Sequence, residues 1–282
     1  MESPALGNTF KVDAGKCTGC GECAADCVAE VLAMRDKLPA VVPDHADWCI
    51  GCQHCLAICP TGAVSILGLD PADSPPLEEA AFDAASFDKL ILGRRSCRRF
   101  SEQPVDPALI DKLLSLAAHA PTGVNNRGRH FTVIRDGKTL GTFREKSTRL
   151  LIEMDKRGDI PEDESWVADC AKSWAGGGRD EIFRGAPHML LVSTAKDSPC
   201  PEQDCLIAMS YFDLLANAHG VGTVWAGIPT RVIKLAAAEL RKDLGIPEDH
   251  EYFYCLLFGM PAAAYRRAAQ RPPESVHFVT DA

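Results

Sequence analysis

Eight of the thirteen cysteines lie in two short runs near the N-terminus. The first run is Cys17-x2-Cys20-x2-Cys23-x3-Cys27, and the second, Cys49-x2-Cys52-x2-Cys55-x3-Cys59, repeats it 32 positions later. Three thiolates at this spacing can hold one face of an iron–sulfur cubane, while the fourth reaches a second cubane. The sequence therefore predicts two 4Fe-4S clusters and a protein that transfers electrons.

The cross-ligation pattern assigns Cys17, Cys20, Cys23 and Cys59 to one cluster and Cys49, Cys52, Cys55 and Cys27 to the other. The alternative metal is zinc, which commonly binds two CxxC pairs separated by a spacer. Each run here has more thiolates than that pattern needs, so iron–sulfur clusters are favoured. The stretch from about residue 8 to 69 resembles a bacterial-type two-cluster ferredoxin, although Val28 stands where such ferredoxins usually carry proline.

The densest cationic feature is Arg94-Arg95-Ser96-Cys97-Arg98-Arg99-Phe100, in an otherwise acidic chain. Guanidinium groups and a hydroxyl at this spacing can bind a phosphate dianion, although a solvated basic patch is an equally good interpretation of this segment alone. The segment resembles the RRSxRxF motif that opens the nitroreductase-like flavoprotein domain, which binds FMN. Four further segments resemble motifs of that family in the same order: residues 120–126, 185–192, 220–223 and 258–261.

The resemblance implies which residues hold FMN. The phosphate and the nearby ring edge would be bound by Arg94, Arg95, Ser96 and Arg98, with Arg267 or Arg271 closing the phosphate site. In this family FMN lies at a dimer interface, so the chain is expected to form a homodimer. The flavin ring would then be approached from the partner subunit by Pro121, Thr122, Gly123 and Asn125, and backbone N–H groups would face flavin N5 from Trp225, Ala226 and Gly227.

The pattern of apolar residues predicts an α+β fold in two domains: a ferredoxin-like domain at 1–69, a linker at 70–87 and an FMN-binding domain at 88–282. Alternation predicts edge strands at 9–13 and 63–66 and an extended segment at 38–43. In the larger domain we expect a helix from Asp106-Pro107 to Pro121 and another at 205–218. Strands are expected at 131–135, 189–194, 221–225 and 252–258, and residues 143–184 are interpreted as a helical excursion or lid.

Composition excludes several classes of partner. The chain has 39 acidic and 30 basic residues and a net charge of −9, so nucleic acid and anionic membranes find no general attraction. No apolar run approaches the length of a membrane span and no signal peptide is recognisable, so a soluble, cytoplasmic protein is expected. Neither the G-x-G-x-x-G fingerprint nor a P-loop occurs, so a nicotinamide Rossmann site is not supported.

Together these features predict an iron–sulfur flavoprotein oxidoreductase. Its clusters would pass single electrons to FMN, which would reduce a small electrophilic acceptor such as a nitroaromatic or a quinone. Two alternatives remain open from the sequence. NAD(P)H could reduce FMN directly with the clusters as the outlet for electrons, or the chain could be a redox sensor or electron carrier without turnover. A redox donor protein is a possible partner as well.

Overall fold

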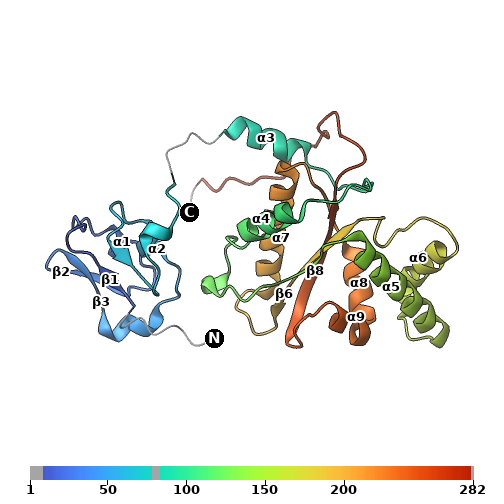
Figure 1. Cartoon of the computed structure of the whole chain (residues 1–282), viewed down its shortest axis with the longest axis horizontal. Helices are drawn as coiled ribbons and strands as arrows, with labels where there is room; N and C mark the ends of the chain where they lie inside the picture. The colour runs from blue at the N-terminus through green and yellow to red at the C-terminus, as the bar shows by residue number, and fades with distance from the viewer. Residues whose placement is uncertain (1–8, 78–82, 281–282) are drawn as a thin grey trace. The chain divides into compact units, whose positions relative to one another are not determined.

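The computed structural model describes residues 9–77 and 83–280. The chain forms two compact units, one comprising residues up to 82 together with 124–126, the other comprising 83–123 and the residues from 127 onward (Figure 1). Each unit is described by itself below. The boundary lies within the segment that the sequence predicts to be a linker.

The first unit is built from two small antiparallel sheets. Strand β1 (Lys11–Val12) pairs with β4 (Val64–Ser65), and β2 (Leu32–Arg35) pairs with β3 (Leu38–Val41). The three extended segments expected from the sequence are therefore present, though shorter. The helices α1 (Glu22–Ala25) and α2 (His54–Ala57) each carry one buried cysteine, and a 3-10 helix spans Pro43–Trp48. Val31, Leu32, Leu56, Val64 and Ile66 form the apolar core around these cysteines.

The predicted linker at 70–87 is wrong at its C-terminal end. Residues 78–82 lie outside the described residues, but residues 84–87 begin helix α3 (Ala84–Gly93). Asp83 caps this helix by accepting a hydrogen bond from the Ser86 N–H at 3.2 Å. No side chain of α3 is fully buried, although Phe87, Leu90 and Ile91 recur at helical spacing. Before the gap, Pro71–Asp73 forms a single 3-10 turn.

The second unit contains a four-stranded antiparallel sheet in the order β5-β6-β8-β7. The strands are β5 (His130–Ile134), β6 (His188–Ala195), β8 (His250–Gly259) and β7 (Gly222–Trp225). All four predicted strands are present within a few residues of their expected ends. Strand β6 and the second half of β8, from Cys255 to Gly259, are almost completely buried, because helices cover both faces of the sheet there.

Successive side chains of the central strands point to opposite faces and divide the core in two. Leu190 and Leu256 face α4 (Pro107–Ala117) and α7 (Pro201–Ala218). Met189 and Leu257 face the other layer, which is formed by α5 (Gly137–Arg157), α6 (Ser165–Ala175), α8 (Gly227–Leu235) and α9 (Ala237–Asp243). Figure 1 shows this arrangement of helix, sheet and helix layers, which is an α+β fold as predicted.

Besides α3, several helices differ from the sequence expectation, and α4 ends at Ala117, before the expected stop at Pro121. Helix α7 begins at Pro201, four residues earlier than expected, because proline is accommodated in the first turn of a helix. Helices α8 and α9 were not predicted. The excursion at 143–184 is helical as expected, but its first helix starts at Gly137, where Asp136 supplies the cap.

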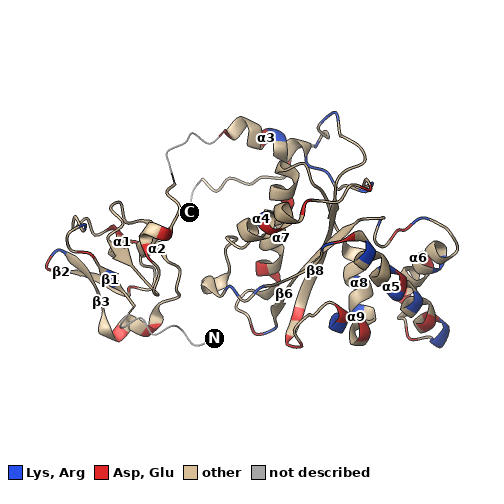
Figure 2. Cartoon of the chain, in the orientation of Figure 1, with Lys and Arg blue, Asp and Glu red and all other residues tan. Residues whose placement is uncertain are grey.

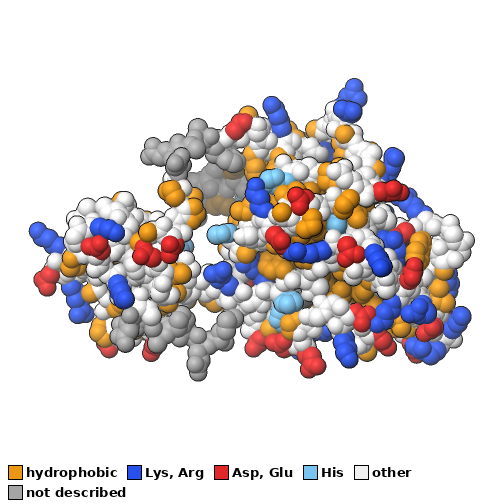
Figure 3. All heavy atoms as spheres, in the orientation of Figure 1, with side chains coloured by type: hydrophobic (Ala, Val, Ile, Leu, Met, Phe, Trp, Pro, Cys, Tyr) orange, Lys and Arg blue, Asp and Glu red, His pale blue; other side chains and the backbone are white. Residues whose placement is uncertain are grey.

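Charged residues of both signs are mixed on several helices of the second unit. Figure 2 shows Lys, Arg, Asp and Glu interspersed on α5, α6 and α9, and Figure 3 shows both signs of charge beside apolar side chains on the visible face of this unit. Among the residues that the structure describes, no helix combines the length and the apolar character needed to cross a bilayer.

Candidate redox-cofactor sites

The first candidate site is a small cavity in the first unit. Four thiols line it: Cys17, Cys20, Cys23 and Cys59. These are the same four that cross-ligation assigns to one cluster. The last is separated from the others by more than thirty residues of chain and is brought back by the pairing of β1 with β4.

The thiols of the second set lie near one another as well. Burial raises the pKa of the Cys49 thiol, and the nearby Cys52 and Cys27 raise it further. Burial also raises the pKa of Cys55 to about 12, with added contributions from Cys52 and Cys49. The thiols of Cys49 and Cys55 therefore favour the protonated form until a metal supplies positive charge, because ligation requires the thiolate.

Backbone N–H groups point at two of the sulfurs. The N–H of Gly51 donates to Cys49 Sγ at 3.4 Å, and that of Ala63 donates to Cys59 Sγ at 3.2 Å. Burial alone would raise the pKa of Cys59, but donation from Ala63 and Thr61 leaves it lowered. N–H donation to cluster sulfurs is one of the means by which proteins set iron–sulfur potentials.

Within residues 9–77 and 83–280, no three His, Cys, Asp or Glu side chains, those of the two cysteine sets included, converge closely enough to hold a single metal ion. The spacing of the cysteines therefore remains the ground on which iron–sulfur clusters are preferred to zinc.

The second candidate site is the arginine segment of the larger unit, which lies along the free edge of β7. Ser96 pairs with Thr223 in a parallel bridge, and the Cys97 N–H donates to the Thr223 carbonyl at 2.7 Å. The chain that leaves β8 closes over the other side of the segment. There the Ala262 N–H donates to Arg99 O at 3.0 Å, and the Tyr265 hydroxyl donates to Ser96 O at 3.2 Å.

Two glycines allow this close approach. A Cβ atom at Gly222 would lie 2.7 Å from Cys97 Sγ and 2.8 Å from Cys97 Cβ. At Gly259 it would lie 2.7 Å from the Pro187 ring and 3.0 Å from Phe100. These distances explain why the 220–223 and 258–261 motifs contain glycine: larger residues would push the arginine segment off the strand.

The predicted phosphate ligands occupy different environments. Arg94, Arg95 and Ser96 are half-buried, whereas Arg98 is exposed. Arg95 lines a cavity of about 190 Å³ together with Cys97, Gly222 and Tyr265. Arg267 and Arg271 lie in the exposed segment that follows Tyr265. Arg267 is therefore only two positions from a residue anchored to Ser96, which favours it over Arg271 as the closing arginine.

A buried carboxylate lies next to this segment, and the sequence analysis did not single it out. Asp213 of α7 accepts hydrogen bonds from the Thr223 hydroxyl, from Asn217 Nδ2 at 2.9 Å and from Trp225 Nε1 at 3.1 Å. Arg94 Nη1 lies 3.6 Å from its Oδ2 atom. In the sequence, the feature that points to this residue is an acidic side chain within an apolar helical stretch.

The loop at 121–127 is strained. Val124, Asn125 and Arg127 all have φ between 46° and 55° although none is glycine. Each left-handed residue of this kind costs about 1–3 kcal/mol, and such strain clusters at functional sites.

The same loop is anchored to α7. The Gly123 N–H donates to Asp204 Oδ1 at 2.9 Å, and the Thr122 hydroxyl accepts from the Arg127 N–H at 3.0 Å. Pro121 is exposed. The structure thus holds this predicted flavin loop in a defined shape, although the family's QPW is replaced here by Arg127-Gly128-Arg129.

The backbone donors of the predicted N5 loop have different surroundings. The Ala226 N–H donates to the Cys255 carbonyl at 2.9 Å as part of the sheet, so it is not available to a flavin. Gly227, in contrast, is the first residue of α8, where N–H groups have no acceptor within the helix. The backbone donor of Gly227 therefore remains suited to that role.

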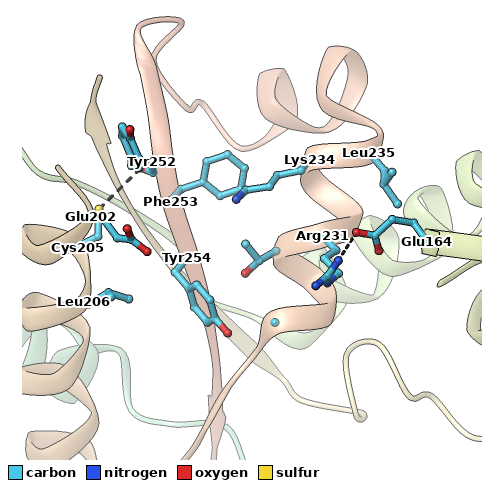
Figure 4. A pocket seen from close by; sticks show the side chains of 12 residues that line it. Glu164, Glu202, Cys205, Leu206, Arg231, Lys234, Leu235, Tyr252, Phe253 and Tyr254 are labelled. Atoms are coloured by element: carbon cyan, nitrogen blue, oxygen red, sulfur yellow. Dashed lines mark hydrogen bonds and ion pairs between the residues drawn. The ribbon is translucent and has the colours of Figure 1, made fainter. Parts of the chain in front are cut away.

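A larger cavity of about 550 Å³ begins beside Gly227 (Figure 4). Its walls include Arg231, Lys234 and the aromatic residues of β8. Its cations are already engaged, since Arg231 pairs with Glu164 and Lys234 Nζ lies 5.5 Å from the centre of the Phe253 ring.

Comparison with known proteins places both units. Residues 91–260 match the model of the nitroreductase family, and residues 16–64 match that of the 4Fe-4S dicluster domain. A protein of Archaeoglobus fulgidus that carries the name NADH dehydrogenase/NAD(P)H nitroreductase is 30% identical over 61% of this chain and 84% of its own length. An iodotyrosine deiodinase of Thermotoga neapolitana is 30% identical over 46% of this chain and 68% of its own length.

Solved structures agree on the fold of the second unit. A nitroreductase from Bacteroides fragilis, crystallised with bound FMN, superimposes with a TM-score of 0.56 at 20% identity, covering 69% of this chain and 98% of that one. A nitroreductase from Desulfitobacterium hafniense, also with bound FMN, gives 0.55 at 23% identity, covering 69% and 98%. At these identities the likeness establishes the fold.

Proposed function

We propose a function that proceeds from one premise: the chain belongs to the nitroreductase family. It joins the domain of that family to a 4Fe-4S dicluster domain. We infer an FMN-dependent oxidoreductase that exchanges electrons between iron–sulfur clusters and flavin and reduces a small electrophilic acceptor, such as a nitroaromatic or a quinone.

One observation carries this proposal. The same chain contains a cavity lined by four cysteines and, in its other unit, an arginine segment fixed along the edge of β7. Thiolates at this spacing suit cubane clusters, and guanidinium groups next to a serine hydroxyl suit a phosphate. When bound, the clusters supply one-electron transfer and FMN supplies both one-electron and two-electron chemistry.

The residues of this chain have separate tasks in the proposal. Arg94, Arg95, Ser96 and Arg98 bind the FMN phosphate, and Arg267 closes it from the exposed C-terminal side. Gly227 offers its N–H at the start of α8, where the partial positive charge of the helix favours a negatively charged partner. The strained loop at 121–125 approaches the flavin of a partner subunit, so a homodimer completes the site.

Content of cofactors tests this proposal directly. The full-length protein, purified without oxygen, is expected to contain about eight irons and one FMN per chain, with matching sulfide. Iron, sulfide and flavin analysis together with the absorption spectrum measure this. Zinc in place of iron, or the absence of flavin, would overturn the proposal.

A second candidate differs in the source of electrons. The names of relatives from Archaeoglobus fulgidus and Methanothermobacter thermautotrophicus include NADH dehydrogenase/NAD(P)H nitroreductase, which favours a nicotinamide donor with the clusters as an outlet. Rapid mixing of the oxidised protein with NADH, NADPH or a reduced ferredoxin separates the two candidates, because only the physiological class of donor should reduce the flavin within turnover time.

A further inference from the structure

We propose that Asp213 is a positioning residue whose buried carboxylate orients Arg94 for the phosphate of FMN, so that selectivity for FMN over riboflavin depends on Asp213. This inference rests on the proposed function, because it presumes that the arginine segment binds FMN. It concerns a residue outside the segment, on the helix behind it.

The carboxylate is held by three segments of the chain. Asp213 is only 5% exposed and lies on α7. Its Oδ1 atom accepts from the Thr223 hydroxyl of β7 and from Asn217 Nδ2 of its own helix, and its Oδ2 atom accepts from Trp225 Nε1. Arg94 Nη1 approaches the same Oδ2 atom to 3.6 Å. The position of the acid is thus fixed independently of Arg94.

Packing alone does not account for an acid here. The neighbouring positions on α7 are occupied by Phe212, Leu214 and Leu215, and Phe212 is completely buried. A buried carboxylate is costly unless every oxygen is hydrogen-bonded or paired with a cation. Arg94 is the cation that the structure places against it, so the carboxylate and the guanidinium are matched to one another.

This pairing affects what Arg94 can offer a ligand. With Nη1 turned toward Asp213, the guanidinium is oriented before any anion binds, and its remaining N–H donors stay available because the side chain is 30% exposed. An oriented side chain loses less rotamer freedom on binding, which favours affinity. A simple charge effect has the opposite sign, since a carboxylate behind the site repels a phosphate. The direction of the mutational effect therefore distinguishes positioning from repulsion.

The test measures binding of FMN and of riboflavin, which lacks the phosphate, to the full-length chain after its flavin has been removed. The variant Asp213→Asn keeps the acceptor for Thr223 and Asn217 but replaces the oxygen facing Arg94 with an amide. We expect FMN affinity to fall about tenfold or more while riboflavin affinity stays within about threefold of wild type. Trp225→Phe loses the indole hydrogen bond to Asp213 but keeps the contact between Asp213 and Arg94, so it should change the FMN-to-riboflavin ratio less than Asp213→Asn does.

A double-mutant cycle tests whether Asp213 affects FMN binding through Arg94. In an Arg94→Gln background, Asp213→Asn should change FMN affinity little further, because the guanidinium to be oriented is gone. The indole N–H resonance of Trp225, assigned with Trp225→Phe, should shift in Asp213→Asn without any flavin, which reports the altered network directly.

The outcomes separate the inference from its premise. Unchanged or tighter FMN binding by Asp213→Asn, an equal loss for both flavins, or additive effects in the cycle would each overturn the positioning role. Failure of the wild-type chain to bind FMN at all would instead overturn the proposed function.

Discussion

Replacing Gly222 with alanine should loosen the arginine segment from β7. The added Cβ atom would lie 2.7 Å from Cys97 Sγ and 2.8 Å from Cys97 Cβ, both closer than real Cβ contacts. Overpacking of this kind costs about 1–3 kcal/mol. For a domain of this size each kcal/mol shifts the melting temperature by about 2–4 °C, so a fall of about 2–12 °C is expected. FMN affinity should fall as well, because the displaced segment carries the phosphate ligands.

Thermal unfolding followed by near-ultraviolet circular dichroism measures the effect, and flavin titration measures the binding. Gly141→Ala is the matched control, since nothing lies within 4 Å of the position that its methyl group would take and it sits inside α5. That change should be neutral or stabilise by about 0.5–1 kcal/mol. Adding Cys97→Gly to Gly222→Ala removes both clashing atoms and should restore part of the lost stability. A Gly222→Ala protein as stable as wild type, with unchanged FMN affinity, would refute the close-approach argument.

Three further changes test separate parts of the account. Cys59→Ala removes the ligand that crosses between the runs, so iron should fall by about half with flavin content retained; loss of flavin too would show that the units are not independent. Asp204→Ala leaves the Gly123 N–H without its acceptor and should lower the free energy of unfolding in urea by about 1–3 kcal/mol. Glu202→Ala, an exposed position on the same turn, should leave it unchanged. Equal effects of the two changes would contradict the anchoring of the loop. Burial lowers the pKa of His188, so its contribution to stability is present above the unfolded value of about 6.5 and is lost as the pH falls through the lower folded value. In His188→Gln, the free energy of unfolding should therefore depend less steeply on pH below about 6.5. An unchanged pH dependence of that free energy would count against a buried neutral imidazole.

The features that could be predicted from the sequence are local. The spacing of the cysteines and of the motifs is a property of neighbouring residues, and the cavity lined by Cys17, Cys20, Cys23 and Cys59 matches the grouping that the spacing indicates. The strands of the larger unit could be located because their apolar, β-branched residues are also neighbours in the sequence. Helix α3 was missed because the proline-rich stretch before it favours a linker, although Phe87, Leu90 and Ile91 recur at helical spacing.

The features that could not be predicted depend on pairing between distant segments. Whether the N–H of Ala226 faces a flavin or a strand is decided by the register of β7 on β8, which no short stretch of sequence specifies. The role of Asp213 likewise emerges only when α7, β7 and the arginine segment are brought together. Its acidic character inside an apolar helix was visible, but its partners were not.

An anaerobic rapid-mixing experiment shows whether the clusters and the flavin exchange electrons. The protein is first reduced with dithionite and then mixed with a quinone or nitroaromatic acceptor, while paramagnetic cluster signals and flavin absorbance are followed on one time base. The account predicts that both signals return to the oxidised state within a single turnover time. Reoxidation of the flavin while the clusters stay reduced would contradict it.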